Sequence, residues 1–115
     1  MNQSFAALLL AARRERQLVI ATALTDGAPS GQARQARLAQ QQGAGAAELR
    51  ADLLADPAQV RAALTAVRAA SSLPLLLTYR STTEGGKGAG HGQGYGDYLA
   101  SLLQLRPAVA AVDIE

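Results

Sequence analysis

The sequence predicts an α/β fold in which strands and helices alternate as βαβαβαβ, so that the strands are parallel. Three observations lead to this prediction. Short apolar segments recur along the chain, and loops of small or polar residues follow them. Between them lie segments with the composition or the apolar spacing of helices. The apolar segments are mostly continuous rather than alternating, which is typical of parallel strands covered on both faces.

The N-terminal part of the chain predicts a helix, a strand and a second helix. Phe5 to Ala12 is apolar but too short to cross a bilayer, so we expect a short amphipathic helix capped by Ser4. Residues 17–25, QLVIATALT, are rich in β-branched residues and run into DGAPSG, which predicts a buried strand and a loop. Residues 31–42 are rich in Ala, Gln and Arg without a helix breaker, and we expect a helix there.

The next strand and helix differ in how clearly the sequence marks them. The middle of residues 43–54, GAGAAELRADLL, is assigned as a strand although Ala, Glu, Leu and Arg favour helices. A helix then begins at Asp56 and Pro57, which suit the N-cap and the first helical position. Its apolar residues recur at helical spacing; they are Val60, Ala63, Leu64 and Val67.

The last third of the chain alternates in the same way. Residues 74–79 are a continuous apolar strand, and residues 84–96 hold seven of the eleven glycines, which predicts a flexible loop. Residues 98–105 predict a helix that Pro107 ends, and residues 108–115 predict a final strand.

Composition argues against several classes of function. The formal net charge is +2, and only Arg13, Arg14 and Arg16 cluster, without aromatic neighbours, so we expect no nucleic-acid partner. The chain has no cysteine, and His91 is its one histidine, so neither a thiolate site nor a histidine zinc site can form within it. We therefore expect a cytoplasmic protein with no metal and no membrane partner.

Ionisable side chains gather where the predicted strands end. Glu48, Arg50 and Asp52 alternate along the second strand and so are expected to share one face. Arg80 follows the third strand, and Asp113 lies near the end of the fourth. Ligands of barrels and open α/β sheets bind at the carboxyl ends of the strands. These residues suit an anionic, hydroxylated small molecule; the alternative is that they are merely solvated charges.

The glycine-rich loop offers weaker candidates. Lys87 is followed by Gly88 rather than by Ser or Thr, so the pattern of a phosphate-binding P-loop fails. We expect a lid or an unstructured tip instead. His91 is expected to be solvated there, because glycine neighbours cannot hold an imidazole in place, and Lys87 is expected to be a hydrated amine rather than a nucleophile.

Four segments resemble the type I 3-dehydroquinate dehydratases. PLLLTYRSTTEGG (74–86) resembles their third-strand motif, in which an apolar strand runs into T-[FY]-R and then E-G-G. AELRAD (47–52) is similar to their second-strand E-x-R-x-D motif, and VDIE (112–115) to the end of their fourth strand. VIAT (19–22) matches their first strand more weakly. The segments follow in the family's order.

The resemblance implies a (β/α)8 TIM barrel, of which four strands would be half. It implies a lyase of the shikimate pathway, and thus of aromatic amino acid biosynthesis, that converts 3-dehydroquinate to 3-dehydroshikimate. A Lys forms a Schiff base with the substrate, a His moves protons, and no metal or dissociable cofactor takes part. By position, four residues would bind substrate and two would support catalysis. The former are Thr22, Glu48, Arg50 and Arg80, and the latter are Glu84, which would orient the His, and Asp113.

Two departures from the family qualify this prediction. Its catalytic His and Lys come from strands after the fourth, and neither His91 nor Lys87 matches them. We therefore expect a helical extension at 1–16, a partial barrel domain at 17–115 truncated after its fourth strand, and no turnover by this chain alone. Two alternatives stay open: a non-catalytic half-barrel that forms a homodimer or binds a complementary half, and a small-anion module that uses Arg50 and Arg80.

Overall fold

Four parallel strands form a single sheet in the order β1-β2-β3-β4. The structure is a computed structural model, and it describes residues 5–15, 19–54, 56–81, 100, 104 and 109–113. The elements are α1 (Phe5–Glu15), β1 (Ala21–Leu24), α2 (Pro29–Gln41), β2 (Ala46–Arg50), the 3-10 turn η1 (Ala51–Leu53), α3 (Pro57–Ala70), β3 (Leu75–Thr78) and β4 (Ala111–Asp113). The alternation and the parallel strands confirm the predicted fold class. The expected helix at 98–105 and the loop at 84–96 lie largely or wholly outside the described residues.

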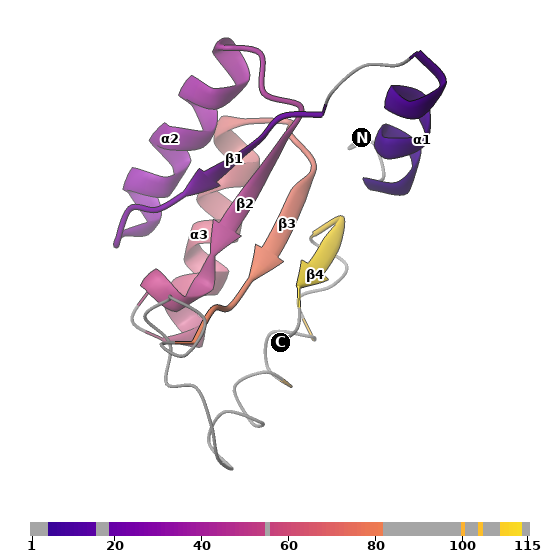
Figure 1. Cartoon of the computed structure of the whole chain (residues 1–115). Helices are drawn as coiled ribbons and strands as arrows, with labels where there is room; N and C mark the ends of the chain where they lie inside the picture. Colours follow the sequence, from indigo (N-terminus) through magenta and orange to yellow (C-terminus); the bar gives the residue numbers. More distant parts are fainter. Residues whose placement is uncertain are drawn as a thin grey trace.

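Helices α2 and α3 pack side by side against one face of the sheet (Figure 1). The strand residues that face them lie in register across the sheet and are fully buried, as Leu24, Leu49 and Leu77 show. The helices contribute small and branched side chains, such as Ala36 and Val60. The described core is therefore built from Ala, Leu and Val, and Tyr79 is its one aromatic member.

Local chemistry explains where α2 and α3 begin and end. The Asp56 carboxylate accepts a hydrogen bond of 2.9 Å from the Gln59 backbone N–H, which confirms the predicted N-cap. Pro29 and Pro57 each stand in the first turn of their helix, where a missing N–H costs nothing. After α2 the chain turns at Gly43, whose φ of 93° favours glycine.

The opposite face of the sheet carries no helix among the described residues. Ala21 and Ala23 of β1 are exposed on it, and Leu76 of β3 is half-buried. We had expected both faces to be covered, and within the described ranges only one is. The strands β1 and β4 form the two edges of the sheet.

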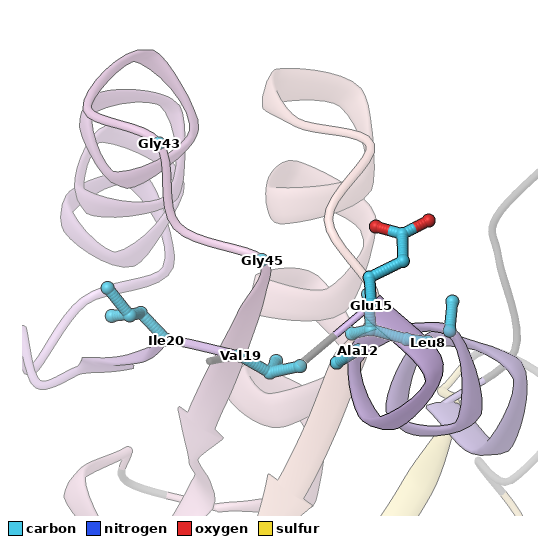
Figure 2. Close-up of a pocket in the computed structure, with 8 residues that line it drawn as sticks. Leu8, Ala12, Glu15, Val19, Ile20, Gly43 and Gly45 are labelled. Atoms are coloured by element: carbon cyan, nitrogen blue, oxygen red, sulfur yellow. The ribbon is translucent and has the colours of Figure 1, made fainter. Parts of the chain in front are cut away.

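Helix α1 lies at the amino ends of the strands, away from the strand ends where ligands were expected. Together with the segments that enter β1 and β2, it lines a half-open cavity of about 230 Å³ (Figure 2). Leu8 and Glu15 line this cavity from α1, and Val19 and Gly45 line it from the sheet side. None of the helices that the structure describes is long and apolar enough to cross a membrane.

Candidate functional site

The open face of the sheet carries the ionisable residues of β2. Glu48 and Arg50 are two residues apart and therefore share a face. In register, Glu48 pairs with Ala23 of β1, whereas Leu49 between them pairs with the buried Leu24. Arg50 is in register with Thr78 of β3, and Thr78 is in register with Asp113 of β4. Three neighbouring strands thus end in a row of polar residues.

Glu48 is held by a neighbouring strand. The Thr78 hydroxyl donates a hydrogen bond of 2.9 Å to Glu48 Oε2. Thr78 is only 1% exposed, so this donor lies in a fixed place inside the sheet. The sequence analysis missed Thr78, although the Thr of the T-[FY]-R pattern was a signal that could have drawn attention to it.

Arg50 is held by Asp52 through two charge-assisted hydrogen bonds. Arg50 Nε and Nη2 donate to the two carboxylate oxygens of Asp52 at 2.8 and 2.7 Å. The Asp52 side chain is fully buried and that of Arg50 is 14% exposed. These hydrogen bonds raise the pKa of Arg50; burial opposes the rise, and the charges of Asp52 and Glu48 add to it. Asp52 occupies one edge of the guanidinium, and no described residue accepts a hydrogen bond from Nη1 on the other edge.

The place of Asp52 differs from the sequence prediction. The expected alternation put Asp52 on the strand, on the same face as Glu48 and Arg50. Strand β2 instead ends at Arg50, and Asp52 lies in η1, where the Leu54 N–H bonds to the Ala51 carbonyl at 3.1 Å. The tight turn places the Asp52 carboxylate against the Arg50 guanidinium.

The structure separates Thr22 from the other predicted site residues. Thr22 pairs in register with Ala47, on the face that meets α2 and α3, and it is half-buried. Arg80 follows Thr78 by two residues and is half-buried, and the structure records no hydrogen bond or ion pair between it and another described residue. Glu84, like Lys87 and His91, lies outside the described residues.

Two glutamines of α2 hold the loop beside β2 and were not expected. Gln32 is fully buried, and its Nε2 donates to the carbonyls of Asp26 and Arg50 at 2.8 and 3.4 Å. Gln35 Oε1 accepts from the backbone N–H groups of Thr25 and Asp26 at 2.9 and 3.0 Å. The loop after β1 is thus tied to the end of β2. In sequence these residues belong to an Ala/Gln/Arg-rich helix in which nothing distinguishes them.

The site can recognise hydroxyl and acidic groups. The free oxygen of Glu48 can accept a hydrogen bond from a hydroxyl, and the open edge of Arg50 can donate to an oxyanion. Among the described residues, no group of three or more His, Cys, Asp or Glu is arranged as a metal site. This part of the sheet is therefore suited to bind a polyhydroxylated acid.

Comparisons with known proteins identify the family of the chain. The model of the type I 3-dehydroquinase family matches residues 20–115. A 3-dehydroquinate dehydratase from Methanoregula boonei is 42% identical over 97 residues, which cover 84% of this chain and 41% of the relative. The relative from Methanosarcina barkeri is 38% identical over 81 residues, or 69% of this chain and 34% of the relative.

Solved structures show the same fold. The 3-dehydroquinate dehydratase of Geobacillus kaustophilus has a TM-score of 0.69 at 24% identity, covering 84% of this chain and 39% of that one. The type I enzyme of Clostridium difficile has a TM-score of 0.70 at 21% identity, with the same coverage of both chains. These neighbours are TIM barrels, and the chain spans about two-fifths of their length. The sheet with its two helices is that part of such a barrel, and the chain belongs to the type I 3-dehydroquinase family.

Proposed function

We propose that this chain supplies a substrate-binding part of a 3-dehydroquinate dehydratase, the shikimate-pathway lyase that converts 3-dehydroquinate to 3-dehydroshikimate. The observation that carries the proposal is the pair formed by Glu48 and Arg50, each held by a separate neighbour on the open face of the sheet. In this proposal Glu48 accepts hydrogen bonds from substrate hydroxyls, and Arg50 and Arg80 donate to its oxygens. We place this reaction in the cytoplasm.

The remaining predicted residues have narrower proposed roles. Asp113, in register with Thr78, joins the polar row and tunes the field around Arg50. Glu84 orients the catalytic histidine that family members carry. The Schiff base forms on a lysine that Lys87 does not match, so we propose binding without turnover for these 115 residues.

Binding of 3-dehydroquinate to the 115-residue chain, measured by isothermal titration calorimetry, tests the proposal. We expect Arg50→Ala and Arg80→Ala to weaken binding about tenfold each, the usual effect of losing a hydrogen bond to a charged group. Arg34→Ala is the matched control, because Arg34 is exposed on α2, on the far side of the sheet. Equal affinity in all three variants would contradict the proposal.

Incubation with 3-dehydroquinate and borohydride tests the absence of covalent chemistry. Borohydride reduces a Schiff base to a stable amine, so an adduct would increase the intact mass. We expect no increase, beside a full-length family member as positive control. An increase at Lys87 would mean that this chain forms its own covalent site.

A second candidate function is that of a half-barrel that associates with another copy or with a complementary half. The observation that favours it is the pair of sheet edges at β1 and β4, together with a face that no described helix covers. Open edges and faces of parallel sheets tend to find partners. Sedimentation velocity over a range of concentrations tests it, and a monomer at every concentration would rule out the homodimer.

A further inference from the structure

We propose that Thr78 is a positioning residue, whose hydroxyl keeps the Glu48 carboxylate away from Arg50 so that both groups remain free to meet a ligand. The ligand part of this inference rests on the proposed function. Its structural part concerns the ligand-free protein. The first observation is that Arg50 has two carboxylates near it, yet it forms an ion pair only with Asp52 among the described residues.

Glu48 and Arg50 form no ion pair with each other, and this requires an explanation. They lie two residues apart on one face of β2. The hydrogen bond to Asp52 is the main cause of the raised pKa of Arg50, and the charge of Glu48 makes the smallest contribution to it. Arg50 retains unused N–H groups at Nη1 and Nη2, because Asp52 accepts from Nε and one hydrogen of Nη2. A charge-assisted hydrogen bond from those groups to Glu48 would be stronger than one from a neutral hydroxyl.

Thr78 supplies the competing contact from a rigid position. Its Cα is in register with that of Arg50, two residues further along β3 than Leu76, which pairs with Glu48. It is almost fully buried, and a β-branched side chain has little freedom about χ1. The single hydroxyl proton is directed at Glu48 Oε2, which leaves Oε1 for a ligand.

Removal of the hydroxyl should therefore close the site. In Thr78→Val the shape of the side chain is kept and the donor is lost. Glu48 would then turn to the open edge of Arg50, and a ligand would have to break that ion pair before it could bind. Thr78→Ser keeps the donor and should keep the site open.

The ligand-free protein provides the first measurement. NMR of the Arg50 side-chain N–H groups and of the Glu48 carboxyl carbon should show shifted signals in Thr78→Val and nearly native signals in Thr78→Ser. Thr65→Val is the matched control, because Thr65 is exposed on α3 and bonds only its own helix. If Thr78→Val is too unstable to study, Thr78→Ala removes the same donor. Native Arg50 signals in the donor-less variant, or a Ser variant that behaves like the Val variant, would overturn the inference.

The second measurement is a double-mutant cycle on 3-dehydroquinate affinity. Thr78→Val should weaken binding about tenfold in the native background, the usual effect of one competing charge-assisted contact. In the Glu48→Gln background it should have little further effect, because the carboxylate that closes the site is gone. An equal loss in both backgrounds would overturn the inference. If the native chain does not bind 3-dehydroquinate at all, the proposed function fails, and the ligand-free signals still decide the role of Thr78.

Discussion

The ion pair of Arg50 with Asp52 is the strongest single contact of the site. A buried carboxylate that loses its cation costs several kcal/mol, whereas loss of the carboxylate leaves a cation that can still reach water. Arg50 is partly exposed, so the second case applies when Asp52 is replaced. Because the folded-state pKa of Arg50 is raised, its share of the stability is present at all lower pH values and is lost only in strong alkali.

We expect Asp52→Asn to lower the free energy of unfolding by about 2 kcal/mol, since the amide oxygen can accept only one of the two hydrogen bonds from Arg50 and the amide NH2 group cannot accept the other. Denaturant unfolding measures this change. Asp113→Asn is the control, because Asp113 is exposed at the end of β4 and its replacement should stay within about 0.5 kcal/mol. Equal free energies of unfolding of the native protein and Asp52→Asn would show that the ion pair of Arg50 and Asp52 does not stabilise the fold.

Gly31 lies against the side chain of Asp26, and its backbone angles do not call for glycine. A Cβ at position 31 would overlap the Asp26 carboxyl group, which accepts a hydrogen bond of 2.9 Å from the Ala28 N–H. We expect Gly31→Ala to destabilise by about 1–3 kcal/mol, although alanine is the better helix former.

The sign of this effect should reverse when Asp26 is shortened. In an Asp26→Ala background no carboxyl group opposes the new Cβ, so Gly31→Ala should be neutral or stabilising by up to about 1 kcal/mol. Thermal unfolding of the four proteins in the cycle gives both values. A loss of stability in both backgrounds would place the cause elsewhere in α2.

At the scale of helices and strands, the sequence predicts most accurately the features that depend only on neighbouring residues. Asp56 and Pro57 mark the start of α3 because a cap needs only its own turn. Strand β2 was assigned against its helix propensity, and pairing with β1 and β3 is what overrides that propensity. The position of Asp52 depends on where β2 ends, and the face on which Thr22 lies depends on the strand register. The local sequence determines neither the end of β2 nor the register.

The capping of α3 gives the prediction at this scale. Asp56→Ala should destabilise the protein by about 1 kcal/mol, because the Gln59 N–H loses its acceptor. Asp56→Ser keeps an acceptor in place and should recover most of that loss. Chemical denaturation of both variants checks this, and two equal losses would show that the charge at the helix start matters rather than the hydrogen bond.

At the scale of the whole molecule, the part of the chain that the structure describes is a sheet with helices packed on one of its faces. Helices α2 and α3 bury one face (Figure 1). The other face carries the alanines of β1, Glu48, and the polar row of Arg50, Thr78 and Asp113. In the solved relatives the matched part is about two-fifths of a barrel. The same face that would meet a substrate is thus the face that another part of a barrel would enclose, so binding and association should compete for it or cooperate through it.

A charge on that face should show whether copies of the chain associate through it. Ala21→Lys puts an ammonium on the exposed β1 edge of the open face, next to the neutral Ala46. If copies associate through this face, sedimentation should show a dimer for the native chain and a monomer for Ala21→Lys. The same change at Ala62, exposed on α3, adds equal charge on the covered side and should leave the dimer intact. Equal weakening by both variants would mean that net charge, rather than the open face, controls association.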